Sequence, residues 1–330
     1  MLAVSVAATP PRSQFVSTVA ANDPLCTEHY RLVLRLPGFP ATQPGQFVQF
    51  ACRDLADDES REQACEVDWQ PGRTLDVCVA DLEAPMALLR RPFSLAGRRD
   101  IDGGAGAVEL DIIHRVVGVG TEWMSRLRGG DTVHILGPLG NTFRLPSPDQ
   151  TGILVGGGVG IPPMLYLAEH LGGAGRHAIA FCGALRRDLL PLTITADADR
   201  EGNPSFCIDE FSRHGLASVI TTDDGSFGFQ GFVTQALERF LDAHRDAQPV
   251  IYTCGPELMM KRVADIAAAR NIECQIAVER AMACGMGTCQ SCCIKVAKPD
   301  PSKPPLPGSD WCYRLACTDG PVFLGKDLLW

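Results

Sequence analysis

The spacing of apolar positions changes about midway along the chain. From residue 15 to about 147, short segments alternate apolar and polar residues and are broken by Gly and Pro, as in His29–Leu36, Gln46–Phe50 and Val108–His114. Alternation with a period of two, repeated over many segments, predicts an antiparallel β-barrel because successive side chains of a strand face opposite sides. One helix is expected to interrupt this barrel, near Thr121–Leu127.

After Pro146–Pro148, continuous apolar runs alternate with helical stretches. Buried strands are predicted at 152–155, 177–182, 217–222 and 250–254, and helices at 162–171, 235–244 and 257–270. This alternation predicts an open, mainly parallel α/β sheet. We therefore divide the chain into a flexible tail (1–14), a barrel (15–147), an α/β domain (148–275) and a small C-terminal lobe (276–330).

Composition narrows the class of protein. A chain of 330 residues is long enough for about two or three cores. It contains no run of 18 apolar residues, so no membrane span is expected. The apolar start Met1–Ala8 lacks a basic region, so no secretory signal is expected. The net charge of −9, without a basic run, argues against nucleic acid as a partner. The acidic stretch Arg53–Gln70 is interpreted as a surface insertion.

The 14 cysteines form two groups. Eight are scattered singly through apolar stretches, where a small buried side chain is the simplest interpretation, and six lie in the last 47 residues. Disulfide scaffolds are short, secreted chains, which this one is not. A reducing cytoplasm suits both groups, so we expect a cytoplasmic protein.

Four of the C-terminal cysteines have the spacing of a plant-type [2Fe–2S] site, C-x4-C-x2-C followed by a distant fourth. They are Cys284, Cys289, Cys292 and Cys317. Gly285 and Gly287 allow a tight loop, in which amide groups can point at the sulfurs. A structural zinc site usually combines two close cysteine pairs, which the four-residue gap disfavours. Cys293 and Cys312 are further candidates, so the fourth ligand stays open.

A glycine-rich turn follows the first strand of the α/β domain and begins a helix. It contains Gly156, Gly158, Gly160 and Pro163. This is the setting in which a phosphate can approach the backbone at a helix N-terminus. However, Pro163 replaces the third glycine of the dinucleotide fingerprint, and the acidic residue expected about 20 positions later is missing. A purely structural turn is the alternative.

Two other segments end predicted strands. The first comprises Arg91, Pro92, Phe93 and Ser94, and the second comprises Cys254, Gly255 and Pro256. An arginine, an aromatic ring and a hydroxyl can clamp a pyrophosphate, stack on a ring and hydrogen-bond a flavin. A small Cys–Gly pair at a strand end leaves room for a nicotinamide ring. A solvated strand edge and a plain strand-to-helix turn are the alternatives.

In this order, the three segments resemble the ferredoxin–NADP⁺ reductase superfamily, in which a β-barrel binds flavin and a following α/β domain binds NAD(P). The short C-terminal cysteine lobe narrows the resemblance to the electron-transfer subunits of two-subunit, NAD-linked dihydroorotate dehydrogenases. The resemblance covers nearly the whole chain from Phe15. Further strings that carry it are Leu89–Ser94, His114–Thr121, Leu136–Asn141, Thr222–Gly228 and Cys317–Phe323.

The resemblance implies three sets of cofactor-binding residues. FAD would be lined by Arg91, Pro92, Phe93 and Ser94, with His114, Arg115 and Val116 along the flavin and Gly120 and Thr121 at its pyrophosphate. The NAD(P) side would comprise Gly156, Gly158, Gly160, Pro163, Asp224, Cys254, Gly255 and Pro256. The [2Fe–2S] cluster would be held by Cys284, Cys289, Cys292 and Cys317. Arg186 and Arg187 lie where a 2′-phosphate could bind, which leaves NADP open.

The implied activity is electron transfer between NAD(P)(H), FAD and the cluster. No catalytic acid or nucleophile is required, since the cofactors perform the chemistry. The expected partner is an FMN-containing dihydroorotate dehydrogenase catalytic subunit of pyrimidine biosynthesis, in a heterotetramer. The alternatives are a related ferredoxin:NADP⁺ transhydrogenase or sulfide dehydrogenase subunit, and a non-enzymatic iron–sulfur redox sensor. An oxygenase reductase would need a larger ferredoxin domain than the residues after Gln275 provide.

Overall fold

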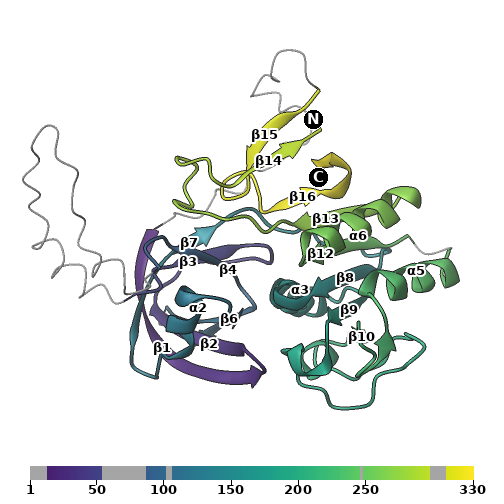
Figure 1. Cartoon of the computed structure of the whole chain (residues 1–330), viewed down its shortest axis with the longest axis horizontal. Coiled ribbons are helices and arrows are strands. Elements are labelled where there is room, and N and C mark those ends of the chain that lie inside the picture. The colour runs from purple at the N-terminus through teal and green to yellow at the C-terminus, as the bar shows by residue number, and fades with distance from the viewer. Residues whose placement is uncertain (1–12, 54–86, 102–105, 246–247, 298–309) are drawn as a thin grey trace, which may run out of the picture.

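A computed structural model of the chain describes residues 13–53, 87–101, 106–245, 248–297 and 310–330. Almost all of the acidic stretch Arg53–Gln70, and the tail up to residue 12, lie outside the described residues. Figure 1 shows the barrel strands on one side, the α/β layers on the other, and the C-terminal residues above both.

The first part is an antiparallel sheet with the strand order β4-β3-β7-β1-β2-β6-β5. Its elements are β1 (Ser13–Cys26), β2 (His29–Pro37), β3 (Phe47–Phe50), β4 (Arg91–Ser94), β5 (Gly97–Ile101), β6 (Ala107–Arg115), α2 (Val119–Ser125) and β7 (Thr132–Leu139). The two edge strands, β4 and β5, are joined by Leu95 and Ala96 alone, so the sheet curls until its edges meet. On β2, Leu32, Leu34 and Leu36 are fully buried, which confirms the alternation seen in the sequence.

The second part is a sheet with the order β11-β10-β9-β8-β12-β13-β16, parallel except for the last strand. Its elements are β8 (Gly152–Gly157), α3 (Ile161–Gly173), β9 (Ala178–Ala184), α4 (Asp209–Ser212), β10 (Ala217–Thr222), β11 (Phe229–Gln230), α5 (Val233–Ala243), β12 (Val250–Cys254), α6 (Glu257–Ala269), β13 (Glu273–Ala277) and β16 (Val322–Leu324). The predicted parallel α/β sheet is thus confirmed. The strand order reverses between β8 and β12, and ligands bind at such switch points, beyond the carboxyl ends of the strands.

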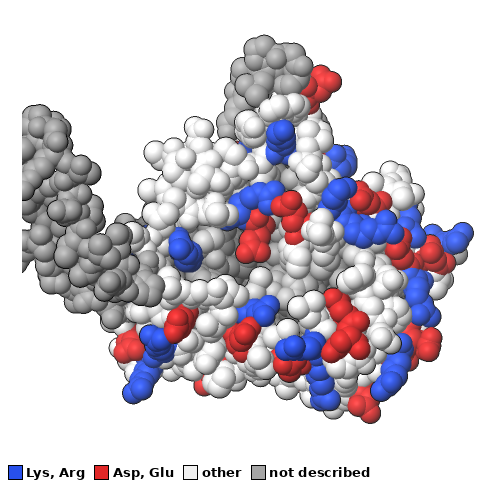
Figure 2. All heavy atoms as spheres, viewed as in Figure 1, with Lys and Arg blue, Asp and Glu red and all other residues white. Residues whose placement is uncertain are grey.

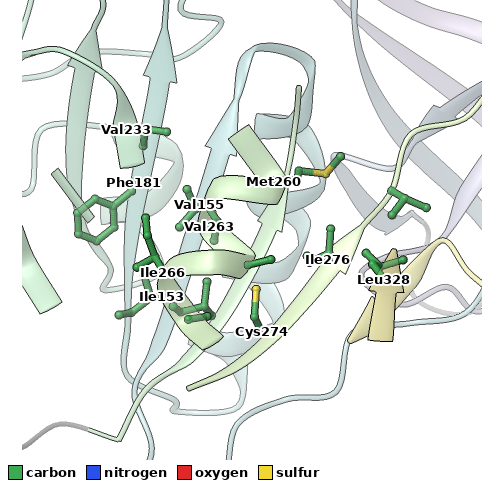
Figure 3. Close-up of a cluster of buried hydrophobic side chains, with 14 of the residues drawn as sticks. Ile153, Val155, Phe181, Val233, Met260, Val263, Ile266, Cys274, Ile276 and Leu328 are labelled. Atoms are coloured by element: carbon green, nitrogen blue, oxygen red, sulfur yellow. The ribbon is translucent and has the colours of Figure 1, made fainter. Parts of the chain in front are cut away.

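The C-terminal residues form a three-stranded sheet of β14 (Cys293–Val296), β15 (Cys312–Leu315) and β17 (Leu328–Leu329), in the order β15-β14-β17. Between β15 and β17 the chain leaves this sheet, because β16 pairs with β13 of the α/β sheet. Leu328 of β17 belongs to the same apolar core as Ile276 of β13 (Figure 3).

That core also reaches the barrel. It includes Phe47 of β3 and Leu139 of β7 together with Cys292 and Cys317 of the C-terminal lobe. The three parts therefore share buried surface, and the domain boundaries remain a prediction. In the described parts of the chain, no helix is both long and apolar enough to cross a bilayer.

Candidate functional site

A cavity of about 860 Å³ lies between the barrel and the carboxyl ends of the parallel strands. Nine of the predicted residues line it: Pro92, Phe93, Ser94, His114, Arg115, Thr121, Gly158, Cys254 and Pro256. Strands β4 and β6 supply the barrel wall, while the turns after β8 and β12 supply the opposite wall. Acidic and basic side chains are interspersed over the face of the molecule seen in Figure 2. The volume of the cavity lies within the range typical of small-molecule and cofactor sites.

Three residues predicted on the flavin side do not line the cavity. Arg91 is exposed, and its Nη1 donates to the carbonyl of Leu89 at 3.2 Å. Val116 is also absent from the lining. Gly120 is buried in α2, where an added Cβ would lie 3.2 Å from that of Cys52, so a glycine lets this helix pack closely. The Thr121 hydroxyl bonds the backbone at the start of α2, accepting from Val117 N at 2.9 Å.

His114 is buried at the cavity with unpaired ring nitrogens. Its side chain is 1% exposed and stacks on Tyr30, with 5.7 Å between ring centroids. Neither ring nitrogen completes a hydrogen bond. Burial, aided by neighbouring His29, lowers the pKa of His114 to about 4. The Nε2 of His29 is also unpaired. The barrel wall thus presents neutral imidazoles that can hydrogen-bond a polar ring such as a flavin.

The glycine-rich turn combines an open surface with close packing. Gly158 has φ of +53°, lines the cavity and has nothing within 4 Å of the position that a Cβ would take. In contrast, a Cβ on Gly160 would lie 2.1 Å from Cys254 O, and one on Gly156 would lie 3.0 Å from the Cα of Ile161. Pro163 is buried in the first turn of α3. Much of this glycine-rich segment therefore serves to pack closely against the end of β12. This is the structural role that was the alternative to phosphate binding.

The acidic residues beside the cavity differ from the prediction in one position. Asp223 lines the cavity, and the predicted Asp224 does not. Asp224 accepts a hydrogen bond from Ser226 N at 2.9 Å. Hydrogen bonds from Ser226 lower the pKa of Asp224. Gly255, also predicted, has φ of +145° and does not line the cavity.

The two arginines considered for a 2′-phosphate already have neighbours. Arg186 pairs with Asp188 at 3.0 Å, and the Arg187 guanidinium lies 4.6 Å from the ring centroid of Phe227. Neither arginine lines the cavity. A phosphate at this point would have to compete with these contacts.

Several lining residues were missed in the sequence. Thr234, Met259, Glu279 and Met282 all line the cavity. Glu279 lies just past the end of β13, a strand that the sequence did not reveal. Because carboxyl ends of parallel strands face the ligand crevice, recognising β13 would have pointed to Glu279.

The cysteine loop, which runs from Cys284 to Cys292, has the backbone of a thiolate-binding turn. Gly285, Gly287 and Gln290 have positive φ values of 69°, 85° and 58°. The Sγ of Cys284 accepts hydrogen bonds from Met286 N and Cys289 N, both at 3.4 Å. Amide groups directed at sulfur stabilise the negative charge of a cluster, so the loop fits an iron–sulfur group.

The thiols of the loop differ in environment. A hydrogen bond with Ser291 lowers the pKa of Cys289 to about 6, whereas burial and the neighbouring Cys292 raise the pKa of Cys317 to about 12. In the described parts of the chain, no three His, Cys, Asp or Glu side chains surround a common point as metal ligands would. The ligand set therefore stays a prediction.

Strand register distinguishes the candidates for the fourth ligand. Cys312 lies opposite Val296 at the far end of the β14–β15 hairpin, and it is buried there. Cys317 follows β15 at the near end, where Ala316 N donates to Cys292 O at 3.1 Å. Cys293 Sγ instead donates to Gln290 O at 2.9 Å. The register favours Cys317 over the other two.

The barrel is anchored directly to the segment that follows Cys317. The side chain of Asn141 donates to Asp319 O at 3.1 Å and to Val322 O at 2.8 Å, and it accepts from Val322 N at 2.8 Å. Phe47 lines the cavity and belongs to the core that contains Cys292 and Cys317. The cavity wall and the cysteine loop therefore share one apolar core.

The fold and this site define a ferredoxin–NADP⁺ reductase-like protein with a C-terminal iron–sulfur domain. The solved structure described as an NADH-dependent reduced ferredoxin-NADP oxidoreductase has the same fold, with a TM-score of 0.66 and 23% identity over 95% of this chain and 90% of that one. The Amycolatopsis cytochrome P450 reductase GcoB is also similar, with a TM-score of 0.55 and 22% identity over 82% and 70%.

Sequence comparisons identify the family. Residues 279–329 match the iron–sulfur cluster binding domain of dihydroorotate dehydrogenase B. The dihydroorotate dehydrogenase B (NAD(+)) electron transfer subunit of Geobacillus kaustophilus is 36% identical, over 79% of this chain and 87% of the relative. The subunit of Desulforamulus reducens is 31% identical over the same shares, 79% and 87%. The chain belongs to this family of electron transfer subunits.

Proposed function

We propose that this chain passes electrons between NAD(H), FAD and a [2Fe–2S] cluster on behalf of a dihydroorotate dehydrogenase catalytic subunit. It is an NAD(P)-linked flavin and iron–sulfur oxidoreductase subunit, as its family membership implies. The observation that carries the proposal is the continuity of the site. One cavity is bordered by the barrel and by the strand ends, and Phe47, which lines that cavity, belongs to the same apolar core as Cys292 and Cys317.

In this proposal each wall of the cavity binds one cofactor. Phe93, Ser94 and His114 hold the flavin ring, and the open backbone at Gly158 admits the nucleotide phosphates. When bound, FAD supplies the exchange between two-electron and one-electron chemistry. Burial raises the pKa of the Cys254 thiol to about 12, so this residue stays neutral and provides space rather than a nucleophile.

We propose NAD rather than NADP as the nucleotide. Asp223 lines the cavity beside Asp224, whose lowered pKa keeps it charged. A 2′-phosphate brought near two carboxylates is repelled, while Arg186 is already paired with Asp188. Replacing Asp223 by Ser should improve the use of NADPH relative to NADH by about tenfold, the equivalent of 1.4 kcal/mol. An unchanged ratio would contradict this assignment.

The proposed partner contains FMN and carries out the pyrimidine chemistry, with both subunits in a heterotetramer. This chain needs no nucleophile or proton donor for dihydroorotate, because its own chemistry is electron transfer, which the cofactors perform. A reducing cytoplasm is the proposed compartment, since it suits the free thiols of the cysteine loop.

The test is an anaerobic visible spectrum of the purified chain before and after NADH, repeated with NADPH. We expect flavin and cluster bands that bleach together with NADH. Dihydroorotate should cause no bleaching until the catalytic subunit is added. Oxidation of dihydroorotate by this chain alone, or a colourless protein that contains zinc, would refute the proposal.

A further inference from the structure

One buried amide takes no part in the site described so far. Gln49 lies in β3 with 0% of its side chain exposed, and neither Nε2 nor Oε1 has a hydrogen-bond partner. An unpaired buried polar group costs about 1–3 kcal/mol. Such a group in a native protein requires an explanation, and a redox role is one that buried unpaired groups are known to serve.

The direction of the Gln49 side chain follows from strand alternation. Val48 and Phe50 belong to the barrel core, so Phe47 and Gln49 extend from the other face of β3. On that face, Phe47 packs into the core that contains Cys292 and Cys317. Gln49 therefore extends from the barrel toward the C-terminal lobe.

The end of the amide lies against the cysteine loop. A Cβ built on Gly285 would lie 2.5 Å from Gln49 Oε1 and 2.8 Å from its Cδ. Only a glycine at this position lets the amide reach the backbone that follows Cys284. The amide oxygen and nitrogen exchange places by a simple flip, so Nε2 can face the loop equally well.

The chemistry of the loop suits an additional donor. Cys284 Sγ already accepts two backbone N–H groups, and a thiolate-held cluster carries further negative charge on its sulfurs. Glutamine supplies two N–H donors and no net charge. Within the part of the chain that the structure describes, no other buried amide side chain has both of its polar atoms unpaired.

We propose that Gln49 is a positioning residue for the iron–sulfur site, and that its Nε2 donates a hydrogen bond to a sulfur of the occupied Cys284–Cys292 loop. The inference rests on the proposed cluster-binding function. Gln49 pairs through its backbone with Pro92, which lines the cofactor cavity. The same strand would thus support the cavity wall and adjust the potential of the cluster.

The experiment replaces Gln49 by Leu in the full chain loaded with flavin and cluster. A donor to sulfur stabilises the reduced, more negative cluster, so its loss should lower the cluster potential. At the wild-type midpoint potential, we expect the ratio of reduced to oxidised cluster to fall at least tenfold, which is about 59 mV for one electron. The measurement is an anaerobic redox titration followed by electron paramagnetic resonance, with the flavin potential recorded in parallel.

The matched control is Thr221→Val, which also removes a buried, unpaired polar group. Thr221 lies in β10, four strands away from β13 in the sheet, and it does not line the cavity. This variant should leave both potentials unchanged. In the cluster-free chain, Q49L should not lower the free energy of unfolding, because an unpaired amide is replaced by an apolar side chain of similar size.

An unchanged cluster potential in Q49L would overturn the proposal, and so would a shift of the flavin potential alone. If Q49L fails to fold, Gln49→Asn takes its place, since the shorter amide should still lower the cluster potential. An unchanged potential in Q49N would equally overturn the proposal. A wild-type chain that binds no cluster would instead refute the proposed function, so the two failures are distinguishable.

Discussion

Replacing His114 by Gln should remove much of the acid sensitivity of the flavin-free barrel. The folded protein holds His114 neutral, with its pKa lowered to about 4 from the ordinary 6.5, mainly by burial. Between these two values the unfolded chain binds a proton that the folded chain does not. Stability is therefore greatest above pH 6.5, and it falls as the pH drops toward 4.

The magnitude follows from the two pKa values. Integrating the linkage relation from pH 7.5 to pH 4.5 gives a loss of about 2.5 kcal/mol from His114 alone, at about 1.36 kcal/mol per pH unit. The pKa of neighbouring His29 is also lowered by burial, which adds a contribution of the same sign. Flavin binding should reduce the effect only if His114 can take up a proton in the flavin-bound protein, because the folded and unfolded states would then bind protons alike.

The assay is urea denaturation of the flavin-free full chain at pH 7.5, 6.0 and 4.5. Wild type and H114Q are compared in the same buffers, so carboxylate titration common to both cancels. The control is His177→Gln, because the ring of His177 is exposed just before β9. Parallel stability curves for wild type and H114Q would refute the reasoning, because they would mean that His114 titrates alike in both states.

Three other variants test the packing around the cofactors. Asn141→Ala removes three hydrogen bonds to the segment after Cys317, so it should cost about 2–3 kcal/mol and speed cluster loss to a chelator, followed by absorbance. Gly160→Ala would place a Cβ 2.1 Å from a carbonyl oxygen of β12, so it should lower the free energy of unfolding by more than ~4 kcal/mol. The control is exposed Gly173→Ala, which should not lower it, and thermal melts of both variants test the difference. Cys317→Ser should abolish the cluster absorbance and Cys312→Ser should keep it, and the opposite pattern would show that the strand register misled us.

Local patterns were sufficient for most strands and helices. Alternation at His29–Leu36 predicted β2 to within a residue of its end, because strand periodicity depends only on neighbouring side chains. β13 was missed because Gln275 interrupts its apolar run. Gln275 is only 2% exposed, and its amide is paired with the backbone N–H and carbonyl of Arg144, which lies far away in sequence. No local pattern can reveal such a partner.

Contacts between residues far apart in sequence also limited what could be predicted of the candidate site. The sequence identified the strand ends that form the cavity, since Ser94, His114 and Cys254 all line it. It could not separate Gly158, which is open to the cavity, from Gly160, which contacts the end of β12. That difference depends on how closely two turns approach, and these turns are about 95 residues apart in the chain. Gln49 was missed for a similar reason, because its importance comes from a loop of another part of the molecule.

The return of β16 to the α/β sheet has a consequence for engineering by exchange of parts. A relative's cluster lobe grafted at residue 276 would replace an edge strand of the nucleotide-binding sheet together with the loop. The new strand would have to match the register of β13 and the hydrogen bonds of Asn141. Successful chimaeras should therefore carry the Leu136–Asn141 segment along with the lobe. We expect the Leu136–Asn141 segment and the C-terminal lobe to change together during the evolution of this family, because each has to fit the other.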